Sequence, residues 1–412
     1  MERISKINQE LNGAKGKEPK YVDSALSWLG FDSMLPESSQ QLIKKLRPIL
    51  ESDKVYKRMV EYVEKSEFPT DIVPLVRDLD IGKHNYAGKF GAVGGSPWDK
   101  FAVLLELGRV DASLATFFMV QHGLMGKTID MFGSEEMKNE WMPKIINLEV
   151  IGGWGLTEQH IGSDASNMST RVREENGEYI LNGNKRWIGN ANKDIMVVFA
   201  KDEKTEEVQC FLIDLTWAGI KREKIQNKLA LRSVQNMQLW FDNVRIPAKN
   251  KLPGVKGFGS VAALLAESRL LVAWLATAMS VGLYDYLMKY VTKRQQFGKP
   301  ITAYQLIQEK IFKVMSIAQS NLFLCHQLTK LHVEGKASIG QIAMAKAFCT
   351  DQLRESARHA RAALGGNGII SDNHVMRTLI DAEVLFTYEG TYDINLLVTG
   401  RELTGIAAFK TR

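Results

Sequence analysis

The sequence predicts a mainly helical protein with a central β domain. Residues 36–147 show a helical pattern of apolar residues, segments rich in β-branched and aromatic residues begin near Ile151, and long apolar helical segments return from Phe258 onward. A chain of 412 residues with 45% hydrophobic content can bury a large core, and its length indicates two or three domains. We therefore expect an N-terminal extension (1–35), an N-terminal helical domain (36–150), a middle β domain (151–257) and a C-terminal four-helix bundle (258–412).

In the N-terminal part, residues 41–52 and 54–65 have helical periodicity and are separated by turn-forming residues. The glycine-rich segment 88–97 interrupts this pattern. Asp111 then stands in a position to cap a helix over 114–132.

The middle third contains five short strand-like segments, 179–181, 185–188, 195–200, 208–215 and 237–246. Asn182-Gly183 is a dipeptide typical of a two-residue hairpin turn, so we expect a hairpin there and an antiparallel domain. The segments expected to form the helical bundle are 260–292, 304–333, 339–364, 374–385 and 393–408.

Composition excludes some functions. The net charge of +6 is modest, and basic residues are interspersed with acidic ones, so nucleic acid is not an expected partner. The three cysteines, Cys210, Cys325 and Cys349, show neither metal-ligand nor redox-pair spacing, which predicts no metal site and reduced thiols in an intracellular protein. The uncharged stretch 270–284 is shorter than the roughly 20 residues of a membrane span, so we expect a buried helix.

Targeting signals leave the location open. Residues 1–20 mix acidic and basic residues without an apolar core, unlike a secretory signal or a transit peptide. The last four residues, 409–412, do not form a Ser-Lys-Leu type peroxisomal signal.

The candidate catalytic residue is Glu389, which stands between Tyr388 and Gly390 at an expected junction of loop and helix. A carboxylate placed there can reach an apolar site as a general base. The alternative is a solvated carboxylate that stabilises the following helix through its dipole.

Three motifs in order resemble those of the acyl-CoA dehydrogenase and acyl-CoA oxidase family. They are Gly155-Leu156-Thr157-Glu158 with Gly162-Ser163-Asp164, Leu364-Gly365-Gly366-Asn367-Gly368, and Tyr388-Glu389-Gly390-Thr391. These flavoenzymes introduce a double bond between Cα and Cβ of an acyl thioester. The resemblance implies the helical, β, helical domain order with a β-barrel-like middle domain. It also implies FAD as cofactor, an acyl-CoA substrate, Glu389 as the base for the α-proton and flavin N5 as hydride acceptor.

The resemblance also implies binding residues. The residues expected to contact FAD are Leu156, Thr157, Gly162, Ser163, Trp187, Ile188, Gly189, Arg294, Phe297, Gln305, Leu364, Gly365, Gly366, Thr391 and Asp393. The residues expected to contact substrate are Ser163, Arg269, Tyr388 and Gly390. Several of these positions have a structural alternative: a polar loop for 156–163, a β-core position for Trp187, helix ends for Arg294 and Gly365, and a paired surface arginine for Arg269.

Two positions refine the expected reaction. Gly189 stands where the family usually has threonine, which could leave space for oxygen near flavin N5, and plant short-chain acyl-CoA oxidases look similar at this point. Ala115 stands where glutaryl-CoA dehydrogenase carries an arginine for a second carboxylate, so we expect a short, apolar acyl tail. Electrons then pass either to oxygen or to an electron-transfer flavoprotein.

In the resembled family, the residues matching Arg294 and Phe297 reach the cofactor of a neighbouring subunit, which implies a homodimer or homotetramer. A mitochondrial or a peroxisomal location fits, and the sequence does not decide between them. The alternative function is a non-catalytic relative used for assembly or ligand sensing.

Overall fold

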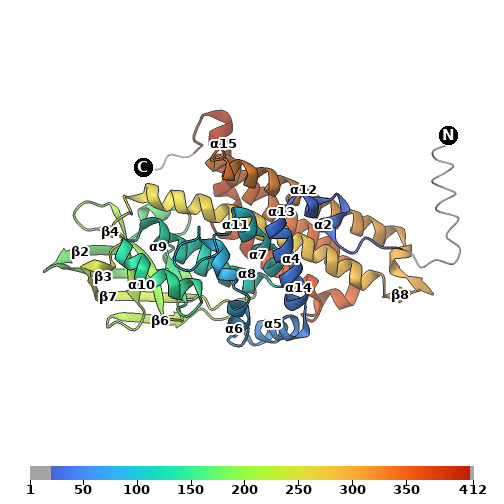
Figure 1. Cartoon of the computed structure of the whole chain (residues 1–412), viewed down its shortest axis with the longest axis horizontal. Helices are drawn as coiled ribbons and strands as arrows, with labels where there is room; N and C mark the ends of the chain where they lie inside the picture. The colour runs from blue at the N-terminus through green and yellow to red at the C-terminus, as the bar shows by residue number, and fades with distance from the viewer. Residues whose placement is uncertain (1–19, 409–412) are drawn as a thin grey trace.

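The computed structural model describes residues 20–408, in which the strands follow one set of helices and precede another along the chain and form a sheet at one end of the molecule (Figure 1). Of the expected extension, residues 1–19 lie outside this range, as do the C-terminal residues 409–412. Residues 20–35 form two short helices, and Phe31 is fully buried with its ring 6.4 Å from that of Trp274.

The N-terminal helices surround a common core. A capping box at Ser96 begins α7, and Asp111 accepts a hydrogen bond from Leu114 N at 3.0 Å and caps α8. The helix expected over 114–132 therefore begins at Ala112, and its centre is π-helical. The helices are α2 (Ala25–Trp28), α3 (Phe31–Met34), α4 (Glu37–Leu50), α5 (Asp53–Lys65), α6 (Ile72–Asp78), η1 (Ile81–Asn85), α7 (Pro97–Val110), α8 (Ala112–Phe118), η2 (Met119–Gly126), α9 (Lys127–Phe132) and α10 (Glu135–Ile146).

The middle part is a seven-stranded sheet in the order β1-β4-β2-β3-β7-β6, with β5 also paired to β4. Most pairs are antiparallel, but β1 and β2 both run parallel to β4, which corrects the expectation of an entirely antiparallel domain. Strand β1 pairs with the start of β4, and β2 pairs with its end along the same edge. Long connections between these strands in the sequence allow the parallel pairing. The strands are β1 (Gly152–Gly155), β2 (Arg171–Glu175), β3 (Glu178–Ile188), β4 (Ile195–Asp202), β5 (Val208–Asp214), β6 (Ile220–Lys224) and β7 (Met237–Pro247).

The hairpin expected at Asn182-Gly183 is wrong. Both residues lie inside the continuous strand β3, where the register shifts between Leu181 and Gly183. Gly183 has φ +140°, and a Cβ there would lie 2.7 Å from Thr170 Cα, so glycine permits a close approach of two backbones. The actual two-residue turn is 176–177, another Asn-Gly pair with positive φ at both residues, which joins β2 to β3.

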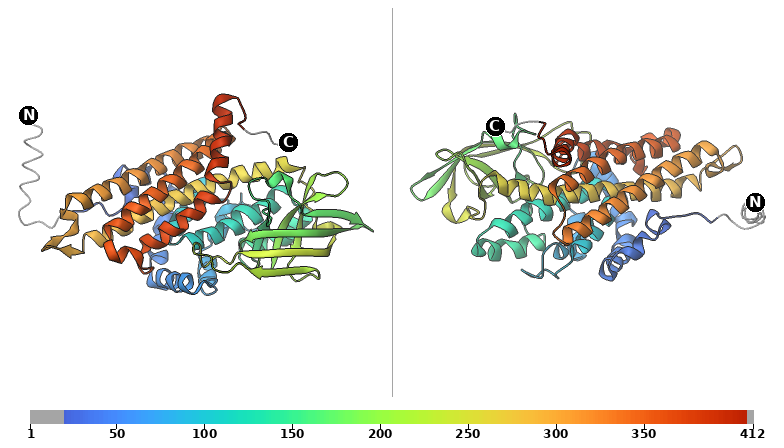
Figure 2. Two further views of the ribbon diagram at one scale, coloured as in Figure 1. Left: turned by 180° about the vertical axis from the view of Figure 1, so that it is seen from behind. Right: turned by 90° about the horizontal axis from the view of Figure 1, so that it is seen from above.

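The long C-terminal helices run along the long axis of the molecule, and the last helix projects across this direction (Figures 1 and 2). Helix α11 extends from the sheet to the opposite end, and its 18-residue apolar window is 72% buried. It is long and apolar enough to span a membrane, but this burial is that of a core helix, as expected from the sequence. The elements are α11 (Phe258–Val291), β8 (Gln295–Gln296), β9 (Lys299–Pro300), α12 (Gln305–Val333), α13 (Ile339–Ala363), η6 (Gly365–Ile369), α14 (His374–Thr387) and α15 (Tyr392–Thr404).

Candidate active site around Glu389

Glu389 lies in the turn between α14 and α15. Its φ is +56° and that of Gly390 is +83°, so two consecutive residues are in the left-handed region. A non-glycine residue in this region is strained and persists only where its surroundings fix it. The conformation orients the Glu389 side chain toward α11, where the Ser268 hydroxyl donates a hydrogen bond to Oε2 at 2.5 Å.

Burial raises the pKa of the Glu389 carboxyl above its usual range, while the Ser268 hydrogen bond and the positive charges of Arg269 and Lys346 lower it. A carboxylate with a raised pKa is a stronger base than one in water. The two cations nevertheless favour its ionised form. The site therefore combines a raised pKa with groups that favour the ionised carboxylate, as a proton-abstracting base requires.

Arg269 is not the paired surface arginine of the structural alternative. It is 9% exposed rather than a surface residue, and its Nε donates to the Glu389 carbonyl at 3.1 Å. Gly390 lies beside it, and a Cβ on Gly390 would come within 3.4 Å of Arg269 Nη2. The structure thus brings Arg269 and Gly390 together with Glu389, and any substrate contact of Arg269 would lie next to the base.

The residues flanking Glu389 have separate roles. The Tyr388 hydroxyl lies 3.5 Å from the Thr116 hydroxyl of α8. Thr391 is the N-cap of α15, since its hydroxyl accepts from Ile394 N at 3.2 Å. Asp393 is exposed in the first turn of the same helix.

The middle-domain candidates form a second group. The backbone N–H of Arg186 donates to the Thr157 carbonyl at 2.8 Å, so the loop after β1 lies beside the end of β3. Leu156 is buried in the core, whereas Ser163 is exposed and open space surrounds the Cα of Gly162. Because its side chain is buried, Leu156 can contact a ligand only through its backbone.

Trp187 is 49% exposed with φ +66°, and the Arg186 guanidinium lies 5.1 Å from the centroid of its ring. It is therefore not a β-core tryptophan. Ile188, by contrast, is 3% exposed and packs in the core of the sheet, so only its backbone can contact a cofactor. A Cβ on Gly189 would be 3.4 Å from Val234 and 3.7 Å from Val120, which are ordinary contacts.

A third group lies at the other end of α11. Arg294 is exposed, its N–H donates to Tyr290 O at 2.9 Å, and Asn367 Nδ2 donates to Tyr290 Oη at 2.6 Å. The turn after α13 and the segment around β8 therefore meet here, far from the sheet (Figure 1). Phe297 is 92% exposed, and Gln305, Gly365 and Gly366 are also exposed, while the Leu364 side chain is buried. The structure does not bring this group to Glu389 within one chain.

A loop over 225–236 connects helix α14, which leads into the Glu389 turn, to the middle-domain group around Trp187. Asn236 Nδ2 donates to the Trp187 carbonyl at 2.9 Å, and Leu231 N donates to Asp381 of α14 at 2.6 Å. Arg232 also donates to Val63 O at the end of α5. The position of Trp187 therefore depends on contacts with both helical parts of the chain.

Sequence reasoning missed four residues around these groups. Glu158 and Lys185 form a buried ion pair at 2.9 Å under the loop that contains Thr157. Ser268 and Lys346 contact the carboxylate or backbone of the Glu389 turn. Ser268 had a signal in the sequence as the neighbour of the selected Arg269, and Glu158 and Lys185 stood in or beside motifs that were selected for other residues, whereas Lys346 had none.

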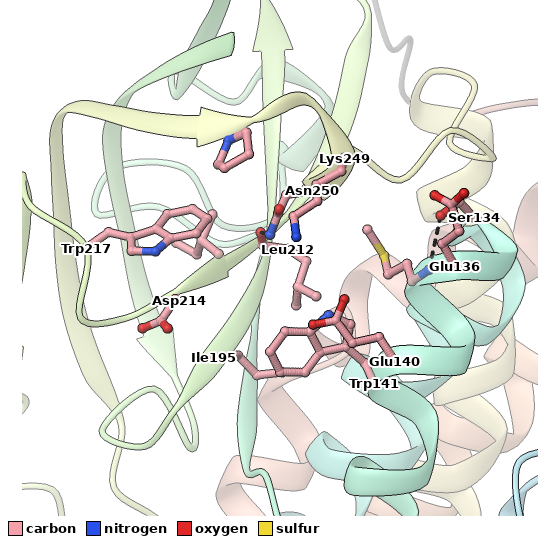
Figure 3. Close-up of a pocket in the computed structure, with 13 residues that line it drawn as sticks. Ser134, Glu136, Glu140, Trp141, Ile195, Leu212, Asp214, Trp217, Lys249 and Asn250 are labelled. Atoms are coloured by element: carbon pink, nitrogen blue, oxygen red, sulfur yellow. Dashed lines mark hydrogen bonds between the residues drawn. The ribbon is translucent and has the colours of Figure 1, made fainter.

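A surface hollow of 190 Å³ lies elsewhere, between α10 and the sheet. Figure 3 shows Trp141 and Glu140 of α10 facing Ile195 and Leu212 of the sheet, with Trp217 at the far side. None of the predicted site residues lines it. It is therefore separate from the Glu389 site.

Comparisons with known proteins agree with this geometry. Family models for the acyl-CoA dehydrogenase N-terminal, middle and C-terminal domains match residues 36–149, 153–244 and 255–404. An acyl-CoA dehydrogenase of Bacillus subtilis is 30% identical over 357 residues, which cover 84% of this chain and 93% of the relative.

Two solved structures are similar over nearly the whole chain. A glutaryl-CoA dehydrogenase of Mycobacterium smegmatis in complex with FADH2 has a TM-score of 0.90 at 29% identity and covers 94% of this chain and 100% of its own. The butyryl-CoA dehydrogenase of Megasphaera elsdenii has a TM-score of 0.84 at 27% identity, with coverages of 90% and 98%.

These observations define a class of protein. Its members are helical, contain a curled central sheet, and carry a desolvated glutamate in a turn of the C-terminal helices. The chain belongs to the acyl-CoA dehydrogenase family, whose members are FAD-dependent oxidoreductases that act on acyl-CoA. The family, the three-domain fold, the FAD-dependent enzyme class and the cofactor expected from the sequence are confirmed.

Proposed function

We propose that the protein oxidises a short-chain acyl-CoA with an apolar tail to the trans-2-enoyl-CoA, with Glu389 as the base that removes the α-proton. The observation that carries this proposal is the Glu389 turn, where burial raises the pKa of a carboxyl that faces Ser268 and two cations. A solvated helix-terminal carboxylate would lack this desolvation, so the structural alternative is disfavoured.

The middle domain fits a flat aromatic cofactor. Trp187 holds its ring half-exposed in a left-handed backbone conformation, which a core tryptophan does not need. The loop 156–163 beside it offers backbone groups and open space at Gly162. These residues would hold the flavin of FAD, which when bound supplies the acceptor for the substrate's β-hydrogen.

The rest of the reaction depends on residues of the chain. The Glu389 carboxylate takes the α-proton, and the Ser268 hydroxyl holds Oε2 in place beforehand. The N–H of Glu389 forms no backbone hydrogen bond within residues 20–408, so it is free to donate to the thioester oxygen and stabilise the developing enolate.

The expected apolar tail rests on α8. Ala115 is fully buried and carries no charge to pair with a second carboxylate, while Thr116 beside it reaches Tyr388. We expect kcat/KM to be at least tenfold higher for butyryl-CoA than for glutaryl-CoA in a steady-state assay. A preference for glutaryl-CoA would contradict the apolar-tail assignment.

The electron acceptor is oxygen or an electron-transfer flavoprotein, and Gly189 favours oxygen because it leaves the space of a threonine side chain empty. The Cβ distances show that a side chain at 189 can be accommodated. The test reduces the enzyme anaerobically with butyryl-CoA and then admits air. Rapid reoxidation with peroxide, slowed at least tenfold in Gly189→Thr, supports an oxidase, whereas slow reoxidation of both forms supports a flavoprotein acceptor.

Exposed apolar residues at the far end of the bundle support an assembly of subunits. Phe297, Leu306 and Phe312 are 92%, 71% and 68% exposed, so this apolar surface is available to another subunit. We propose a homodimer or homotetramer in which Arg294 and Phe297 complete a neighbour's FAD site, which light scattering would show as a multiple of 46.3 kDa. A mitochondrial or peroxisomal location stays a prediction that imaging of the tagged full chain would test.

A further inference from the structure

Lys346 lies on α13 directly beneath the Glu389 turn. Its side chain is fully buried, yet it forms no salt bridge among the described residues. Instead, its Nζ donates to two carbonyls, that of Phe386 at 3.2 Å and that of Gly390 at 2.7 Å. These carbonyls stand on the two sides of Glu389, so one ammonium group spans the turn that carries the base.

The turn is held from three helices. Lys346 of α13 and Asn395 of α15 both donate to the Gly390 carbonyl, Asn395 at 2.8 Å. Arg269 of α11 donates to the neighbouring carbonyl, that of Glu389. The left-handed conformation of Glu389 costs about 1 kcal/mol or more, so these donors are what keep it populated.

We propose that Lys346 is a positioning residue for the Glu389 base: its ammonium group fixes the turn on both sides of Glu389 and places a positive charge behind the carboxylate. The inference rests on the proposed function of Glu389. It goes further in assigning the orientation of the base to a buried lysine that touches neither FAD nor substrate.

The electrostatics agree with this geometry. The charged groups that face Lys346 are Glu389, from the turn between α14 and α15, and Arg269, from α11. Burial lowers the pKa of Lys346 to about 7, although the Glu389 charge raises it. In turn the Lys346 charge lowers the pKa of Glu389, so removal of that charge makes the base harder to ionise.

The alternative is that Lys346 only stabilises the C-terminal end of α14 by donating to one of its last carbonyls. That role would change stability without changing the pH dependence of catalysis. The test therefore compares Lys346→Met, which removes donor and charge, with Lys346→Arg, which keeps both. Arg358→Met, on the same helix with a side chain 72% exposed, is the matched control.

Two readouts are taken on the FAD-loaded, full-length protein. Anaerobic single-turnover flavin reduction by butyryl-CoA is measured against pH, and hydrogen exchange is measured for peptides covering 386–395. We expect Lys346→Met to reduce the limiting rate at pH 7 at least tenfold with little change in substrate affinity, and to move the acidic limb upward by about one pH unit. Amide hydrogen exchange in the turn should accelerate about tenfold in Lys346→Met. Lys346→Arg should keep most of the wild-type flavin-reduction profile and most of the protection of the turn.

A Lys346→Met protein with wild-type rate, acidic limb and turn protection would overturn the proposal. If Lys346→Met does not fold, Lys346→Gln decides, because it keeps a donor without the charge. A shifted acidic limb in that variant supports the proposal, and an unchanged one overturns it. Failure of the wild-type flavin to be reduced would instead refute the proposed function, while turn protection would still report on Lys346.

Discussion

Replacement of Lys185 by methionine should loosen the loop that contains Thr157. The Lys185 Nζ lies 2.9 Å from Glu158 Oε1, and the two side chains are 0% and 1% exposed. Burial raises the pKa of Glu158, but the Lys185 charge and hydrogen bonds from Ser169 and Thr170 outweigh it and bring the pKa to about 2. Burial lowers the pKa of Lys185 to about 8, so both partners are charged at neutral pH, and there the carboxylate needs its partner.

The magnitude follows from this burial. Removing one member of a buried pair costs about 3–5 kcal/mol, because the remaining charge is left uncompensated. That range corresponds to a loss of hydrogen-exchange protection of roughly 10²-fold to several thousandfold. Replacing both residues, in Glu158→Gln with Lys185→Met, should recover most of the loss, since no lone charge remains.

The assay is hydrogen exchange with mass spectrometry on peptides covering 156–163 and 182–188. Lys201→Met is the matched control, because that lysine lies on β4 and faces the half-exposed Glu206 at 3.8 Å, where loss of the pair should cost less than about 1 kcal/mol. Protection in Lys185→Met within threefold of wild type, or a double variant as weak as the single one, would refute the reasoning.

Two further predictions concern single residues. Ser268→Ala removes a hydrogen bond that lowers the pKa of Glu389, so the acidic limb of the flavin-reduction profile should rise by about one pH unit, and an unmoved limb would contradict this role. Burial raises the pKa of Asp381 to about 7, far above its unfolded value near 4. The native state therefore keeps the Asp381 proton to a higher pH than the unfolded state does, so the free energy of unfolding falls as pH rises from about 4 to 7. Asp381→Asn, which keeps an acceptor for Leu231 N, should raise the denaturant midpoint at pH 8 but not at pH 4; a lower midpoint at pH 8 would count against it.

The sequence predicted the domain order and the Glu389 turn because local patterns determine both. Helical and strand periodicities show which faces are buried, and a Tyr-Glu-Gly-Thr motif before a helix indicates a turn. The hairpin at 182–183 was misplaced because the middle domain contains two Asn-Gly pairs, at 176–177 and at 182–183. Local chemistry does not show that Gly183 lies against the Thr170 backbone, which makes it a bulge inside a strand.

Lys346 and Lys185 could not be found by the same route. A lysine in a helix or strand is typical of a solvated surface, and only tertiary packing shows that each is fully buried. The same limit applies to Arg269, which the resemblance assigned to substrate, whereas only the fold shows that it also donates to the Glu389 carbonyl. Arg294 and Phe297 were assigned to a neighbouring subunit's cofactor by resemblance alone, since nothing local shows where α11 ends in space.

The most direct test is an anaerobic spectral titration of the FAD-loaded protein with butyryl-CoA, carried out on the wild type and on Glu389→Gln. The amide keeps the size of the side chain but cannot accept the α-proton, because only the carboxylate is a base. We predict that the wild-type flavin absorbance bleaches, and that Glu389→Gln retains FAD and binds butyryl-CoA while its bleaching rate falls at least 10³-fold. Bleaching of Glu389→Gln at the wild-type rate would contradict the assignment of Glu389 as the base.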